Sequence, residues 1–101
     1  MSQIIKLIFF LVYFNSMIKI PFDILSCFSS LLIKNAIEQR YHYHYKKWLR
    51  YYFDFCHKYK YPKESYNSLP YFINKLQEKN QNQFQQKQAA HAISLYYEIT
   101  Q

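Results

Sequence analysis

The chain has 101 residues, a formal net charge of +7 and no glycine, and 22% of its residues are aromatic. This length allows one domain with a modest core and is short for most enzymes, while the high apolar content argues against a disordered chain. Tight hairpins and phosphate-cradling loops usually need glycine, so its absence disfavours all-β architectures. We therefore predict an all-α protein whose positive charge suits nucleic acid or an anionic membrane.

The N-terminal segment, residues 4–20, is the most apolar part of the chain. Its longest apolar run has eight residues, whereas a membrane-spanning helix needs about 20. Lys6 before the run and Asn15 after it resemble the flanks of a signal peptide, but no small-x-small cleavage site follows. Two readings stay open: a signal or anchor, or a helix or strand that packs on the domain or on a partner. We treat residues 1–20 as a hydrophobic extension and residues 21–101 as a helical domain.

Residues 21–35, PFDILSCFSSLLIKN, predict an amphipathic helix. Pro21 and Asp23 suit its first turn, and Asn35 is expected to end it. The predicted apolar face consists of Phe22, Leu25, Phe28, Leu32 and Ile33.

Residues 37–59 predict a long helix. The first five residues of YHYHYKKWLRYYFDFCHKYKY alternate as in a strand, but the apolar positions from Tyr45 onward follow helical spacing. The predicted inner face consists of Tyr45, Trp48, Leu49, Tyr52, Cys56 and Tyr59, and the outer face of Lys46, Lys47, Arg50, Asp54 and His57. The rings of Trp48, Tyr52, Phe55 and Tyr59 could stack on single-stranded bases, but helical spacing favours a core role, and we expect Trp48 to be buried.

Two further helices are expected in the second half of the chain. Residues 61–67 have the composition of a loop, and Ser68 is expected to cap a helix that runs to Asn80 with Pro70 in its first turn. The apolar face of that helix would consist of Tyr71, Phe72, Leu76 and Leu69. A last helix is expected over residues 82–100, with Phe84, Ala89, Ala92 or Ile93, and Tyr96 facing inward. The prediction is therefore a bundle of four helices.

The order of these elements over residues 21–100 resembles the N-terminal core-binding domain of tyrosine recombinases, above all integron-type and phage-type integrases. The most specific pieces are YHYHYKKWLRYYFDFCHKY and QQKQAAHAISLYYEI. In that family they are the second and fourth helices of a SAM-like bundle that grips one side of duplex DNA. The resemblance thus implies a four-helix SAM-like bundle with duplex DNA as its partner. Residues 1–20 match no family.

The chain departs from that family in its catalytic residues. Recombinase chemistry needs two widely separated arginines, a histidine set and a tyrosine nucleophile, all in a separate C-terminal domain. Here the only arginines are Arg40 and Arg50, in one predicted helix. We expect no catalysis by this chain alone, which is then an isolated domain or a non-functional fragment of a truncated integrase gene. The resemblance implies a cytoplasmic, nucleoid-associated protein, with a catalytic recombinase domain or other recombinase protomers as further partners.

Two sets of polar residues are candidates for DNA contact. Lys46, Lys47 and Arg50 are predicted to share one side of a helix, where cations neutralise phosphates and release counterions. On the last helix Lys87, His91 and Ser94 form a stripe with Gln86 and Gln88 alongside, and glutamine can contact adenine through both atoms of its amide. Contact by about five cations predicts a log K against log salt slope near −4 to −5. The alternative is an ordinary solvated face.

Other chemistries have little support. His42 and His44 point apart on a helix, and the adjacent Cys56 and His57 fit no zinc spacing, so we expect no metal and no cofactor. Cys27 and Cys56 are expected to be reduced, buried thiols. Nothing resembles the nucleophile elbow of a hydrolase.

The alternative function is that of a small membrane-associated or secreted basic helical protein. Residues 4–20 and the positive charge are the features that suggest it.

Overall fold

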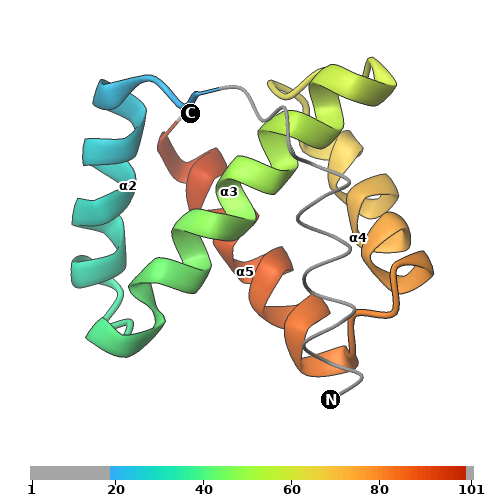
Figure 1. Ribbon diagram of the computed structural model, residues 1–101. Helices are drawn as coiled ribbons and strands as arrows, with labels where there is room; N and C mark the ends of the chain where they lie inside the picture. Colours follow the sequence, from blue (N-terminus) through green and yellow to red (C-terminus); the bar gives the residue numbers. More distant parts are fainter. Residues whose placement is uncertain (1–18, 100–101) are drawn as a thin grey trace.

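The computed structural model describes residues 19–99, and the predicted hydrophobic extension therefore lies almost wholly outside the described residues. The described part is all-helical, and the predicted all-α bundle of four helices is confirmed. The helices are α2 (Phe22–Lys34), α3 (Gln39–Tyr59), α4 (Leu69–Glu78) and α5 (Gln83–Ile99), with a 3₁₀ turn, η1 (Tyr66–Ser68), before α4. In Figure 1 the long helix α3 crosses α5, and α2 and α4 flank the crossing on opposite sides. Helix α5 packs against each of the other three helices.

The helices of this chain end and connect without glycine. Pro21 is the N-cap of α2, Asp23 lies in its first turn, and Asn35 ends it as predicted. Three later corner residues, Ala36, Lys60 and Asn80, adopt positive φ angles of 57°, 62° and 64°. Helix ends commonly place glycine in this left-handed conformation because a Cβ atom makes it less favourable. The corners of this bundle therefore carry a conformational cost.

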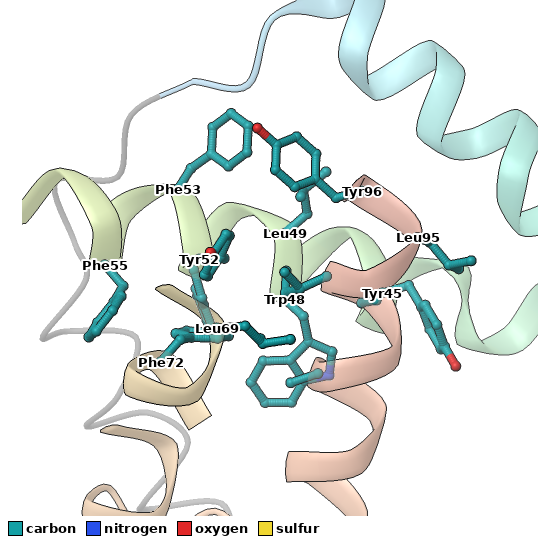
Figure 2. Packing of buried hydrophobic residues seen from close by; sticks show 14 of the residues in the cluster. Tyr45, Trp48, Leu49, Tyr52, Phe53, Phe55, Leu69, Phe72, Leu95 and Tyr96 are labelled. Carbon is teal, nitrogen blue, oxygen red and sulfur yellow. The ribbon is translucent and has the colours of Figure 1, made fainter. Parts of the chain in front are cut away.

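The core forms around the inner face of α3. Tyr45, Trp48, Leu49, Tyr52 and Cys56 are buried as predicted, while Tyr59 is half-buried. They pack with Phe28 and Leu32 from α2, Leu69, Phe72 and Leu76 from α4, and Ala89, Ala92, Ile93, Leu95, Tyr96 and Tyr97 from α5. Figure 2 shows the rings of this core between α3, α4 and α5, and Trp48 itself is 1% exposed. The burial of Trp48, Tyr52 and Phe55 confirms that these rings are core residues and do not form a surface for bases.

Four aromatic or aliphatic residues that were expected to face inward are exposed instead: Phe22, Ile33, Tyr71 and Phe84. The buried stripe of α2 consists of Phe28 and Leu32, and residue 33 is turned about 100° away from residue 32. Phe84 is in the first turn of α5, before the stretch that packs in the core. Tyr71 stacks on Tyr61 at the surface, with ring centroids 4.8 Å apart.

The prediction that the Ser68 side chain caps α4 is wrong. Ser68 occupies the N-cap position, but its backbone is already helical and its side chain caps nothing. Its hydroxyl instead donates to the carbonyl oxygen of Pro62, 2.8 Å away. Ser65 caps the preceding 3₁₀ turn by accepting from the backbone N–H of Asn67. The hydroxyls of Ser65 and Ser68 therefore hold the loop between α3 and α4, and the Ser68 bond reaches back to Pro62 near its start.

Candidate nucleic-acid interface

The outward face of α3 carries an exposed basic stripe. Tyr43, Arg50 and His57 are exposed and Lys46 is partly exposed, at the helical spacing expected of one face. Lys46 and Arg50 line a common hollow of about 310 Å³, which we call the basic hollow. Its other lining residues are Tyr43, Lys19, Ile20 and Leu25. The structure therefore brings together two of the three α3 cations expected to contact DNA and adds a third cation, Lys19.

Lys47 does not belong to that face, contrary to the prediction. Its side chain is buried, and its Nζ lies 4.9 Å from the ring centroid of Trp48 and 6.0 Å from that of Tyr51. Burial, and then the neighbouring charge of Arg50, lower the pKa of Lys47. The long apolar stem of lysine packs well along aromatic rings, and its charge is attracted to their faces. Lys47 is thus a partner of the core aromatic residues and is not placed to reach a phosphate.

The acidic residue expected on the same face is also withdrawn from the surface. Asp54 is 5% exposed, and burial raises its pKa, an effect that Lys58 and His57 oppose. Across residues 19–99, neither Lys46 nor Arg50 forms an ion pair. The outward face of α3 therefore presents its cations without a neutralising carboxylate close by.

The second predicted set lies on α5, beside the start of α3. Lys87, Gln88 and His91 line a separate hollow of about 390 Å³ together with Tyr41, Tyr45 and Phe84; we call it the aromatic hollow. The Tyr45 hydroxyl is hydrogen-bonded to His91 Nδ1 over 2.8 Å. Trp48 Nε1 donates to Gln88 Oε1 over 2.9 Å. These bonds tie the α5 set to the inner face of α3, whereas Lys46 and Arg50 lie on its outward face. The two predicted sets are thus not brought together in one hollow.

Three glutamine and serine side chains of the α5 set are already engaged. Gln88 Oε1 accepts from Trp48, so its amide cannot present both atoms outward to an adenine as predicted. Gln86 Nε2 donates to the backbone oxygen of Gln81 at 2.8 Å and holds the turn before α5. Ser94 Oγ donates to the carbonyl oxygen of His91 at 2.7 Å. Of the α5 set, Lys87 and His91 keep the most exposed side chains.

Histidines and cysteines form no cluster in the part that the structure describes. No group of three or more His, Cys, Asp or Glu residues is placed to hold a metal ion there. His42 is buried and bonds to the carbonyl oxygen of Ile37 at 2.8 Å, while burial and then the charge of Lys47 lower the pKa of His44. Both cysteines are free thiols, and Cys56 is buried as expected. Cys27 is exposed, contrary to expectation, because it lies outside the buried stripe of α2.

Sequence reasoning missed Lys19, Tyr43, Tyr41 and Phe84 as lining residues of the two hollows. Lys19 was assigned to the N-terminal extension, and Phe84 to the core. The one available signal was the alternation of Tyr41, Tyr43 and Tyr45, which on a helix sends successive tyrosines to different sides.

Comparison with known proteins finds no matching family model, no similar curated protein and no similar solved structure. Within residues 19–99, no helix combines the length and apolar character needed to cross a membrane.

Proposed function

We propose that this protein binds duplex DNA through the outward face of α3, with Lys46, Arg50 and Lys19 on backbone phosphates. The observation that carries the proposal is the basic hollow, where these three cations converge beside the exposed residue Tyr43. None of its described lining residues is acidic. A cluster of unpaired cations at the surface attracts a polyanion, and tyrosine hydroxyls commonly donate to phosphate oxygens.

The lining of the basic hollow suits contact with backbone phosphates better than readout of bases. Ile20 and Leu25 contribute apolar lining beside the cations. Lysine and arginine next to apolar surface extend their charged ends toward water, where a projecting phosphate can meet them. Lysine contacts of this kind position a protein on DNA without carrying sequence information. We therefore expect weak binding with little sequence preference.

The resemblance of the chain to core-binding domains of integrases supports the same proposal. Such domains are all-α, and the four helices of this chain are compatible with an all-α bundle. We propose that the protein acts as the DNA-gripping part of such a recombinase, with a catalytic recombinase domain or other protomers as partners. It would not cleave DNA by itself, because Arg40 and Arg50 lie on the same helix.

The experiment that tests the proposal is a titration of labelled duplex DNA with the full chain at several salt concentrations. With three cations on phosphates, at roughly −0.9 each, the slope of log K against log salt should be about −3. This is shallower than the sequence alone suggested, because Lys47 is buried and the cations of α5 lie in a different hollow. An affinity that does not depend on salt, or no binding at low salt, would contradict the proposal. Tighter binding to anionic vesicles than to duplex DNA at equal salt would favour a lipid surface instead.

The absence of catalysis has its own test. A suicide DNA substrate traps the covalent tyrosine–phosphate intermediate of a recombinase. We expect no such adduct, because no tyrosine here has arginines converging on it from different elements to stabilise the charge that develops in phosphoryl transfer. A covalent protein–DNA adduct would refute this part of the proposal.

A further inference from the structure

The aromatic hollow lies between the first halves of α3 and α5, on a different side of α3 from Lys46 and Arg50. Its volume of about 390 Å³ falls in the range of small-molecule sites. Among its described lining residues none is acidic, whereas Lys87 is exposed and forms no ion pair within residues 19–99. The hollow therefore suits a ligand that carries negative charge.

Aromatic rings form part of its lining. Phe84 is 64% exposed because it lies in the first turn of α5, before the packed part of that helix begins. Tyr41 is half-buried, and the guanidinium of Arg40, which pairs with Glu38 at 3.1 Å, lies 4.9 Å from its ring centroid. An exposed aromatic face gains free energy when another flat ring covers it. Aromatic rings beside Lys87 therefore match a ligand that combines a flat ring with an anionic group.

The polar side chains of the hollow are fixed before any ligand arrives. His91 Nδ1 is engaged by the Tyr45 hydroxyl, and the two rings meet edge to face with centroids 5.5 Å apart. Gln88 Oε1 is engaged by Trp48 Nε1. The amide NH₂ of Gln88 and Nε2 of His91 are thus the groups left for a ligand. Such pre-arranged partners lower the entropic cost of binding.

We propose that the aromatic hollow binds an unstacked base of single-stranded nucleic acid. The base lies against Phe84, its ring nitrogens or carbonyl oxygens meet Gln88 and His91, and the adjoining phosphate meets Lys87. Stacking of this kind tolerates any base, because every base offers a flat face. In a duplex these faces are covered by neighbouring base pairs, so this site is distinct from the duplex contact at the basic hollow and does not rest on it.

The test is a titration of the full chain with a short oligothymidylate at low salt, followed by anisotropy and by the fluorescence of Trp48. Trp48 is the only tryptophan and is bonded to Gln88, so it reports on the hollow. We expect Phe84→Ala to weaken oligothymidylate binding by about tenfold and Phe84→Tyr to retain it. Phe22→Ala is the matched control, because Phe22 is 83% exposed and lies outside the hollow.

Equal loss of affinity in Phe84→Ala and Phe22→Ala, or no binding of the oligothymidylate, would overturn the proposal. Equal affinity for an abasic strand of the same length would also overturn it, since charge alone would then explain binding. Lys46→Ala with Arg50→Ala should weaken duplex binding and leave oligothymidylate binding unchanged. Measuring both ligands on this double variant shows whether the single-strand site or the duplex site has failed.

Discussion

The indole nitrogen of Trp48 donates a 2.9 Å hydrogen bond to the side-chain oxygen of Gln88, 40 residues later in the chain. The bond joins a core residue on α3 to a lining residue of the aromatic hollow on α5. It satisfies the one polar atom that a buried tryptophan carries. It also fixes the orientation of the Gln88 amide, so the packing of the core determines which groups α5 offers to a ligand.

Trp48→Ala should lower the free energy of unfolding by about 3–5 kcal/mol. The change removes a fully buried ring, leaves a cavity and strips Gln88 of its partner. For a domain of this size that loss is a large part of the total stability, so the variant should be partly unfolded at body temperature. Chemical denaturation followed by circular dichroism measures it. Tyr43→Ala, at a 66% exposed position of the same helix, is the control and should change stability little.

Tyr97→Phe should loosen the loop between α3 and α4. The Tyr97 hydroxyl lies 2.8 Å from the backbone oxygens of both Lys63 and Ser65, which share its single proton, and it also bonds to the Tyr52 hydroxyl. Removing it takes one partner from the part-buried carbonyl oxygen of Lys63 and from the buried hydroxyl of Tyr52, while Ser65 O keeps the backbone N–H of Ser68, and should cost about 1–3 kcal/mol. Hydrogen exchange should show faster opening of residues 61–67. If Tyr66→Phe, at an exposed neighbouring position, has the same effect, the anchoring role of Tyr97 is wrong.

Lys60→Gly should raise the free energy of unfolding by about 0.5–1 kcal/mol. Lys60 has a φ of 62° at the end of α3, a conformation that glycine adopts without the steric cost of a Cβ atom. The control is Lys58→Gly, two residues earlier inside the same helix, which should lower stability by about 1 kcal/mol. Thermal or chemical denaturation of the two variants should therefore give changes of opposite sign.

The protein should lose stability as the pH rises above about 10. Burial raises the pKa of the hydroxyls of four core tyrosines, Tyr51, Tyr52, Tyr96 and Tyr97, with Tyr96 and Tyr97 raised to about 12. Unfolded tyrosines ionise near pH 10, so above that pH the unfolded state binds fewer protons and the free energy of unfolding falls. Their contribution is fully present below pH 10.

Lys47 has the opposite effect on how the free energy of unfolding changes with pH. Its pKa is lowered by burial and by Arg50, so its contribution to stability increases with pH up to about 10.5. We expect the four tyrosines to outweigh this one lysine. Denaturation midpoints at a series of alkaline pH values, with tyrosinate absorbance as the second readout, measure the balance. A free energy of unfolding that stays constant above pH 10 would show that the core tyrosines ionise as freely as exposed ones.

The helices and the centre of the core were predictable because they depend on local periodicity. The row from Tyr45 to Cys56 follows helical spacing closely enough to identify the inner face of α3, and Trp48 lies at its centre. Phe84 was assigned wrongly, because periodicity does not reveal that the packed part of α5 begins later than the helix does.

The candidate site was less predictable because it depends on partners far apart in the sequence. Lys47 was assigned to the solvent by its charge, yet its apolar stem lies along the rings of Trp48 and Tyr51. Gln88 was treated as a free amide, and only the crossing of α3 and α5 shows that Trp48 occupies its oxygen. Charge and spacing found Lys46 and Arg50, which face outward on one helix.

The central claim, that duplex DNA meets the outward face of α3, is tested most directly by two charge-matched double variants. Lys46→Ala with Arg50→Ala removes two cations of the basic hollow, while Lys34→Ala with Lys58→Ala removes two exposed cations elsewhere. For the first variant we expect the slope of log K against log salt to change from about −3 to about −1. The control should keep a slope near −3, with unchanged helical content in both. Equal slopes for the two variants would contradict the claim.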